Sequence, residues 1–324
     1  MDPQLPLTTE DEPRPNDLGD RMIVVTGKQK ELLDQAVSLD EQDAREAGSI
    51  GFSARLWAQV ALPYRNPGEL PSWKRTNGTM TLFVRPGFVK TAPDQDPVSA
   101  YPFGVVPRLL LTWMATEAVL TKDRELELGT SMRQFRKALE MSDDGRSRRR
   151  MKDQVQRLAS ATLTVLDTRA NVLAGSNFTF ADEWRLWWTD QETQEQALFP
   201  STITLSQKFF DSIIQAPVPI DLRALAYLRR NGGGGLPIDI YIWLAHRMYR
   251  QWMRQDPTFP IPWAYLANQF GSQYKELHRF RARFLDALRN VLIAYPEAKV
   301  LVTDDGLILR PSPPPVPPKR QISA

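Results

Sequence analysis

Apolar side chains at spacings of three and four recur twice along the chain. Leu111 and Met114, for example, reappear 130 residues later as Tyr241 and Leu244. Residues with this spacing share one stripe of a helix, which must face a core. The matched stripes are Leu111, Met114 and Ala118 with Tyr241, Leu244 and Met248; Met132, Phe135 and Leu139 with Trp263, Leu266 and Phe270; and Met151, Val155 and Leu158 with Phe284, Leu288 and Val291.

The first repeat predicts the order helix, short strand, helix, helix, hairpin. Pro107 stands near the start of the first helix, where its missing N–H costs least, and Ser131 is a candidate N-cap for the second. Alternation of apolar and polar residues marks the hairpin strands. The predicted elements are helix 103–122, strand 126–128, helices 132–140 and 147–160, and strands 162–166 and 178–180.

The second repeat predicts the same order, and the turn Asp304-Asp305-Gly306 closes its hairpin because Gly tolerates a positive φ. Its elements are helix 237–253, strand 259–261, a helix begun by Pro262, helix 274–294, and strands 299–302 and 307–310. Between the repeats we expect a strand, helices 206–214 and 221–230, and a flexible joint at residues 232–235. The order helix, short strand, helix, helix, hairpin, which the two repeats share, is typical of a winged helix.

The predicted fold is therefore α+β, with tandem winged-helix domains at 101–198 and 199–310. Residues 1–50 hold twelve acidic and five basic side chains and are expected to be mostly disordered, with a candidate helix at 29–47. Residues 51–100 form an N-terminal extension with a strand at 79–85. Residues 311–324 form a Pro-rich tail, which is expected to leave the last strand in an extended conformation.

Composition excludes several classes of chemistry. The 324 residues include no Cys and two isolated His, His246 and His278, so we expect no metal and no cofactor. No apolar run approaches the ~18 residues of a membrane span, and the acidic start is unlike a signal peptide. We therefore expect a cytoplasmic protein that is not an enzyme. Asp143-Asp144 and Asp304-Asp305 stand in predicted turns, where Asp is favoured for local hydrogen bonds.

Basic side chains gather on the predicted third helix of each repeat. The net charge of the whole chain is +3, and residues 1–50 carry −7, so the remaining chain carries +10. Arg and Gln can read base edges in the major groove, and Lys or Arg can bind phosphate. The candidate DNA-binding residues are Arg146, Arg148, Arg149, Lys152, Gln156, Lys275, Arg279, Arg281, Arg283, Arg289 and Asn290.

Either basic stripe taken singly is equally typical of a solvated helix face, and only their recurrence at equivalent positions favours DNA binding. The aromatic run Trp184, Trp187 and Trp188 also has two interpretations. It fits core packing of a strand, and it fits a surface for a dimer or for a contact between domains.

Several ordered motifs resemble those of the plasmid-encoded RepA replication initiators. They span roughly residues 50–318 and comprise Ala61-Leu62-Pro63-Tyr64, Arg75-Thr76-Asn77-Gly78, Tyr101 to Arg108, Phe209-Phe210, Pro217 to Leu225, Phe270-Gly271-Ser272 and Tyr295-Pro296-Glu297-Ala298. The resemblance implies a protein that binds repeated sequences in double-stranded DNA at a plasmid origin. It also implies opening of the duplex, recruitment of host replication proteins such as a helicase or initiator, and a homodimeric form that represses its own gene.

Two other functions remain open from the sequence. A transcriptional regulator with two winged helices would share the DNA-binding surface without starting replication. A protein-interaction adaptor would use winged helices without binding DNA. A strand-nicking enzyme is disfavoured, because His246 and His278 stand too far apart in the chain for a His-hydrophobe-His metal site.

Overall fold

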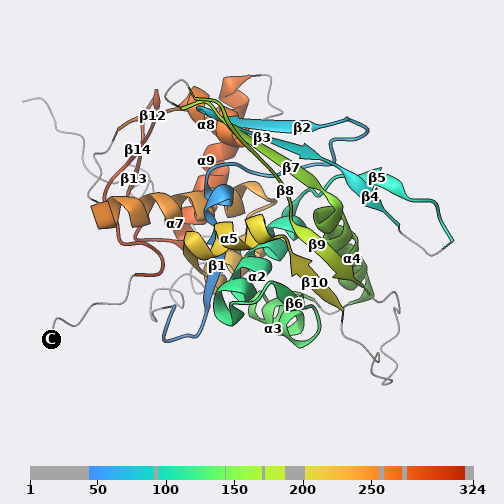
Figure 1. Cartoon of the computed structure of the whole chain (residues 1–324). Coiled ribbons are helices and arrows are strands. Elements are labelled where there is room, and N and C mark those ends of the chain that lie inside the picture. Colours follow the sequence, from blue (N-terminus) through green and yellow to red (C-terminus); the bar gives the residue numbers. More distant parts are fainter. Residues whose placement is uncertain are drawn as a thin grey trace, which may run out of the picture.

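The fold is a mixture of helices and small antiparallel sheets in a computed structural model (Figure 1). The structure describes residues 44–90, 94–142, 144–169, 172–186, 201–254, 259–271 and 276–317. The expected α+β class is confirmed at this level. The described residues do not include the N-terminus that we expected to be disordered, most of the candidate helix at 29–47, Trp187, Trp188 or Lys275. Residues 44–48, at the end of that candidate helix, form a turn.

The first repeat is built around helix α2 (Val105–Thr121), which is apolar on almost all sides and buried along most of its length. Such a helix belongs at the centre of a core. Strand β6 (Glu125–Glu127), helix α3 (Thr130–Ala138) and helix α4 (Gly145–Ser160) follow in the predicted order. Helix α3 begins one residue before Ser131 and has Gly129 at its N-cap, so the predicted Ser131 cap is wrong.

Strand β6 belongs to a three-stranded antiparallel sheet with the order β6–β10–β9. Strand β9 (Ala181–Arg185) and strand β10 (Thr202–Leu205) pair with each other, and β10 also pairs with β6 through Ile203 opposite Leu126. The predicted first domain ends at residue 198, before β10 begins. The strands that pair with β10 nevertheless lie within that domain. Trp184, on β9, is 38% exposed.

The second repeat has the same plan. Its central helix α7 (Leu236–Arg254) is followed by β12 (Ile261–Pro262), α8 (Trp263–Phe270), α9 (Leu277–Ala294), β13 (Val300–Val302) and β14 (Gly306–Leu309). The strand order is β12–β14–β13. In both repeats the last strand, β10 or β14, is therefore the middle strand of the sheet. It pairs with the strand that follows the first helix, β6 or β12, and with the strand that precedes it in the chain, β9 or β13.

The hairpin predicted after α4 forms, but its partner is the N-terminal extension. Strands β7 (Thr162–Asp167) and β8 (Ala174–Thr179) join β2 (Trp73–Asn77) and β3 (Met80–Arg85) in a sheet with the order β2–β3–β7–β8 (Figure 1). The predicted strand at 79–85 is thus confirmed. Strand β3 pairs with β7 along six residues. In chain order the β7–β8 hairpin stands between α4 and β9, the first strand of the pair β9–β10.

A connecting region joins the two repeats. It contains helix α5 (Gln207–Gln215), strand β11 (Pro217–Asp221) and helix α6 (Leu222–Asn231). Strand β11 pairs with β1 (Ile50–Ala54), so the extension crosses this region as well. Arg229, near the end of α6, donates from Nε to the carbonyl oxygen of Leu139 just beyond α3, at 3.1 Å.

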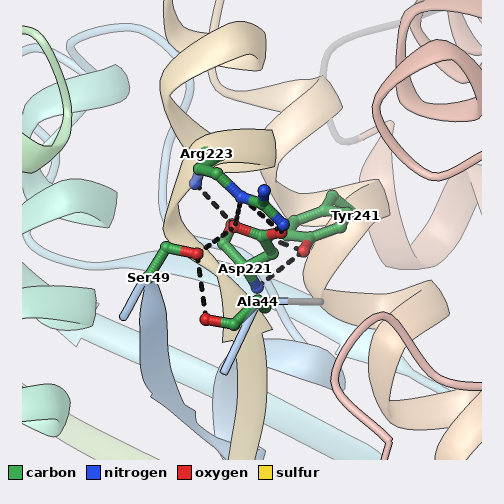
Figure 2. A network of polar contacts seen from close by, with 5 residues as sticks. All are labelled: Ala44, Ser49, Asp221, Arg223 and Tyr241. Atoms are coloured by element: carbon green, nitrogen blue, oxygen red, sulfur yellow. Dashed lines mark hydrogen bonds and ion pairs between the residues drawn. The ribbon is translucent and has the colours of Figure 1, made fainter. Parts of the chain in front are cut away.

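Asp221 ties β1, β11 and α7 together at the start of α6 (Figure 2). Its carboxylate accepts the backbone N–H of Arg223 at 2.8 Å and the hydroxyl of Ser49 at 3.1 Å. Its own backbone N–H donates to the Tyr241 hydroxyl at 2.9 Å. The carboxylate is therefore both the N-cap of α6 and an anchor for the extension.

A buried ion pair joins the two central helices. Arg108 on α2 donates from Nε and Nη2 to the Asp239 carboxylate on α7 at 2.8 and 2.7 Å. The same guanidinium donates to the carbonyl oxygens of Leu62, Pro63 and Gly104. Burial by itself lowers the pKa of Arg108, but the Asp239 carboxylate and, to a smaller extent, Tyr64 together outweigh burial and raise that pKa.

The glycine run at residues 232–235, which we expected to be a flexible joint, is closely packed at its first and last residues. A Cβ on Gly235 would lie 2.8 Å from the Arg108 Nε, and a Cβ on Gly232 would lie 2.5 Å from the Leu228 carbonyl oxygen. Gly233 has a φ of +70°, which favours glycine. The run is therefore needed to bring α7 close to Arg108.

The first residues of the Pro-rich tail, 311–317, pack onto the body, whereas the sequence led us to expect a tail that leaves it after the last strand. Ser312 and Val316 are at most 1% exposed. The Tyr295 hydroxyl donates to the carbonyl oxygen of Pro313, and Arg45 donates from Nη2 to that of Pro317 at 2.8 Å. The tail thus lies against the C-cap residue of α9 and against the turn at residues 44–48.

Replacing Asp239 with Asn should lower the free energy of unfolding by about 3 to 5 kcal/mol, because Arg108 would remain buried without its counter-charge. Urea denaturation followed by fluorescence would measure the loss. The matched control is Asp182→Asn, which removes a partly exposed partner of Arg124 and should cost at most about 1 kcal/mol. Equal effects of the two substitutions would contradict the assigned role of the buried pair.

Candidate nucleic-acid interface

Helix α4 begins in a fixed geometry because Asp144 caps it. The Asp144 carboxylate accepts the backbone N–H of Ser147 at 2.8 Å and also the hydroxyls of Ser142 and Ser147. The hydrogen bond from Ser142 is the largest of the effects that lower the pKa of Asp144. The carboxylate is therefore ionised at neutral pH and opposes the helix dipole at this end.

The first two turns of α4 expose a group of arginines that comprises Arg146, Arg149 and Arg150. In the part of the chain that the structure describes, no ion pair involves these three side chains. Further along, Arg157 pairs with Asp153 at 2.8 Å and donates to the Tyr101 carbonyl oxygen. The arginines of α4 without an acidic partner among the described residues thus lie in the N-terminal half of the helix.

Arg150 is absent from the sequence-predicted set. The predicted stripe follows Arg149, Lys152 and Gln156, but Arg150 lies four residues after Arg146 and therefore on the same helix face. That spacing is the signal that could have identified it. Arg148 and Lys152, which are in the predicted set, are half-buried.

Gln156 is buried, so the prediction that its side chain lies on the solvent-exposed basic stripe of α4 is wrong. Its side chain is 8% exposed, and its Oε1 accepts the backbone N–H of Lys90 at 3.2 Å. The cause is strand β4 (Gly87–Val89), which pairs with β5 (Val98–Ala100) and packs on the second half of α4. A Cβ on Gly87 would lie 2.1 Å from the Ser160 carbonyl oxygen.

Helix α9 presents the second basic surface. Arg279, Arg283 and Arg289 are exposed, whereas Arg281 and Asn290 are half-buried. Leu277 lies seven residues before Phe284, a spacing that favours the core face, yet it is 48% exposed at the first residue of the helix. Lys275 lies outside the described residues.

Most arginines of α9 already have acidic neighbours. Arg279 pairs with Glu276 at 2.7 Å, and Arg289 pairs with Asp286 at 2.6 Å. Arg283 has no such pair among the described residues. Exposed pairs of this kind contribute little to stability, so phosphate can replace the carboxylate at small cost.

Arg281 differs because it is held from two sides. Its Cζ lies 5.3 Å from the centre of the Trp263 ring, and its Nη2 lies 3.2 Å from the Asp304 carboxylate at the tip of the β13–β14 hairpin. Asp304 is fully exposed. An acidic tip repels phosphate, so the hairpin tip itself is poorly suited to lie along the DNA backbone.

No cluster of His, Asp and Glu side chains in the described ranges is arranged to hold a metal ion. Within the same ranges, no helix has the length and apolarity needed to cross a bilayer.

A family model described as plasmid-encoded RepA protein matches residues 101–263. The match spans half of the chain. The chain belongs to the plasmid-encoded RepA family. The region of the RepA match runs from the residues before α2 to the first residue of α8, so it includes α4 and ends before α9.

Two solved structures of domains 2 and 3 of RctB are similar to this chain. Their TM-scores are 0.46 and 0.41, each with 12% identity. The alignments cover 79% and 78% of this chain and 94% of each RctB chain. No curated protein matches.

Replacing Gly87 with Ala should lower the free energy of unfolding by about 1 to 3 kcal/mol, because the new methyl group would meet the end of α4. Thermal or urea denaturation would measure the change. Gly145→Ala is the matched control, since a Cβ there meets nothing within 4 Å. An unchanged Gly87→Ala protein would show that β4 does not pack closely on α4.

Proposed function

We propose that this RepA-family protein is a plasmid replication initiator that binds repeated double-stranded sequences at an origin through two winged-helix units. The observation that supports it best is the repeated topology. Each repeat has helix, strand, helix, helix and the same order of sheet strands, β6–β10–β9 and β12–β14–β13. The third helix of each, α4 and α9, exposes arginines.

In this proposal the first unit extends to residue 205, because β10 completes its sheet. Its wing is the β9–β10 hairpin, and β7–β8 is an insertion that binds the N-terminal extension. The second unit comprises α7 to β14. The third helices would enter successive major grooves on one face of the duplex, about one turn or ~34 Å apart.

The proposed contacts follow from exposure. On α4 they are Arg146, Arg149 and Arg150, with Arg148 and Lys152 at the border. On α9 they are Arg279, Arg283 and Arg289, with Arg281 and Asn290 beside them. Gln156 is left out because it is buried. Lys275 remains a proposed contact from its place in the sequence.

Family membership also supports opening of the origin, recruitment of host replication proteins, a homodimer that represses its own gene, and action in the bacterial cytoplasm. These belong to the proposal, as does the absence of catalysis. The tandem regulator and the protein-interaction adaptor are the competing functions. The exposed cations on two equivalent helices favour a DNA-binding function over the adaptor.

Substituting Ala for Arg149 and Arg150 together should weaken binding to DNA that flanks the gene. Each lost base contact costs about 1 to 3 kcal/mol, and each lost phosphate contact reduces the slope of log affinity against log salt by about 0.9. Fluorescence anisotropy across a salt series measures both quantities. Arg283→Ala tests α9 in the same way.

Arg65→Ala is the control for these variants, because Arg65 is exposed on the loop before β2. It should leave the affinity within twofold of the parent. If the Arg149→Ala, Arg150→Ala variant and the Arg283→Ala variant bind DNA as tightly as the Arg65→Ala control, neither α4 nor α9 is the DNA-reading helix. If the parent shows no salt-dependent affinity for DNA, the adaptor function is favoured.

Replication itself separates the initiator from the regulator. The protein supplied in trans should support replication of a plasmid that carries only the flanking DNA as its origin. The Arg149→Ala, Arg150→Ala variant should give fewer or no transformants, because the origin repeats would be poorly occupied. Footprints over the flanking DNA without any replication would identify a regulator.

A further inference from the structure

The sheet β2–β3–β7–β8 has two faces of different character (Figure 1). Side chains alternate between the two faces along each strand. Leu82 and Val84 on β3 are fully buried and face the core. Thr81, Phe83 and Arg85 alternate with them and therefore lie on the opposite face, which we call the outer face of the sheet.

The strand register gives the other members of the outer face. Its central row, in which each residue stands opposite the next, is Lys74, Phe83, Thr164 and Asn177. The flanking rows are Thr76, Thr81, Leu166 and Gly175 on one side, and Arg85, Thr162 and Thr179 on the other. All of these residues are described by the structure, and none of them is acidic.

The neighbouring helices contact the sheet through its inner face. Phe178 on β8 stacks on Phe209 of α5, with ring centres 6.4 Å apart. Arg75 on β2 donates to the Gln269 carbonyl oxygen of α8. Phe83, by contrast, belongs neither to the core nor to the apolar side chains that pack against it, and it is partly exposed. The outer face is therefore the solvent side of the sheet.

The outer face carries cations without counter-charges. Lys74 and Arg85 are exposed, and within the described ranges neither side chain makes an ion pair or a hydrogen bond. The acidic residue of the four strands is Asp167, at the end of β7. Its carboxylate already pairs with Arg169 at 2.6 Å. The outer face thus holds two positive charges and no negative one.

Phe83 lies between these two cations. Lys74 stands directly opposite Phe83 on β2, where paired residues are about 5 Å apart. Arg85 is the next residue of β3 on the same face, about 7 Å away. An aromatic ring beside cations on an open surface suits a single strand of nucleic acid, because a base stacks on the ring while its phosphates lie near the cations.

The polar side chains of the central row add a hydrogen-bonding group. The Thr164 hydroxyl donates to the Asn177 Oδ1 at 2.7 Å. This contact orients the amide and leaves its Nδ2 to donate to a ligand on the same face. An amide N–H is a suitable donor for the oxygen and nitrogen acceptors of a base.

We propose that the outer face of this sheet binds single-stranded DNA. One base would stack on Phe83, phosphates on either side of it would pair with Lys74 and Arg85, and Asn177 would donate to a neighbouring base. The proposal rests on the proposed replication function for the source of the strand, since opening of an origin exposes single strands. It gives the sheet a role separate from α4 and α9.

The chemistry of the face favours a single strand over a duplex or a protein. In a duplex the faces of the bases are covered by their neighbours, and only the base edges are accessible in the grooves. A ring on a broad sheet can therefore stack only on an unpaired base. The centre of a protein interface is depleted of charged residues, whereas here Lys74 and Arg85 flank the central ring.

The first test measures the salt dependence of binding with the full-length protein and a fluorescein-labelled thymidine oligonucleotide, which forms no duplex. We expect saturable binding by fluorescence anisotropy. Lys74→Gln and Arg85→Gln should each reduce the slope of log affinity against log salt by about 0.7, the contribution of one phosphate of a single strand. The matched control is Lys122→Gln, at the exposed C-cap of α2, which should leave the slope unchanged.

The second test removes the ring and keeps an apolar side chain on the strand. Phe83→Leu should weaken binding of the thymidine oligonucleotide at least about fivefold, because stacking of one base is lost. Phe83→Trp should bind at least as tightly as the parent, which a merely structural role of Phe83 does not predict. Phe88→Leu, at a 74% exposed phenylalanine on β4, is the matched control and should have no effect.

Two outcomes would overturn the proposal directly. One is the absence of saturable binding by the parent, and the other is a folded Phe83→Leu protein, checked by thermal denaturation, that binds as the parent does. A uridine oligonucleotide separates DNA from RNA, and tighter binding of the RNA would refute the assignment to DNA. Ultraviolet crosslinking of the thymidine oligonucleotide should modify β3, and modification of α4 or α9 alone would refute the site.

Duplex affinity separates this inference from the proposed replication function. Phe83→Leu should bind the flanking duplex as the parent does, and the Arg149→Ala, Arg150→Ala variant should bind the thymidine oligonucleotide as the parent does. If Phe83→Leu loses duplex and single-strand affinity equally, the sheet belongs to the duplex interface and the inference is wrong. If the parent binds no duplex but binds the oligonucleotide through Phe83, the proposed origin binding fails and the sheet site stands.

Discussion

The ion pair between Arg108 and Asp239 is the constraint on which the arrangement of the two repeats depends. Both charges are buried, with side-chain exposures of 3% and 5%, so neither can be left without the other. The guanidinium also binds three carbonyl oxygens from the segment before α2. Its Cζ lies 4.6 Å from the centre of the Tyr64 ring. One side chain therefore links α2, α7 and the N-terminal extension.

The extension is a structural part of both repeats. Its strand β1 pairs with β11, its strands β2 and β3 receive the hairpin after α4, and β4 covers the second half of α4. Arg75 on β2 is 1% exposed and donates to the Gln269 carbonyl oxygen of α8 at 3.3 Å. Burial lowers the pKa of Arg75. The basic helices are thus held by contacts that begin outside the repeats.

Charge is distributed unevenly between the two basic helices. The exposed arginines Arg146, Arg149 and Arg150 of α4 have no acidic partner among the described residues, while Arg279 and Arg289 of α9 pair with Glu276 at the N-cap and with Asp286. The acidic tip at Asp304 holds Arg281 in place. These differences make the two helices unequal in the DNA-binding proposal.

The local pattern determined most helices and their order, because a stripe of apolar residues at three-and-four spacing has one stable arrangement against a core. It also indicated the hairpins and the third helices as the sites of exposed arginines. What the sequence could not determine was which strands pair, because pairing joins residues far apart in the chain. The pairing of β10 with β6, the hairpin β7–β8 with β3, and β1 with β11 is of this kind.

The residues of the candidate DNA-binding site also fall into those that the sequence could predict and those that it could not. Arg146, Arg149, Arg279 and Arg283 could be predicted as exposed because their own helix decides which face they occupy. Gln156 could not, since its burial depends on β4, a strand about seventy residues earlier in the chain. The Pro-rich tail also packs on a surface that exists only after α9 has folded. Periodicity therefore determined the faces of single helices, and only the tertiary structure decided what covers each face, because burial depends on partners distant in sequence.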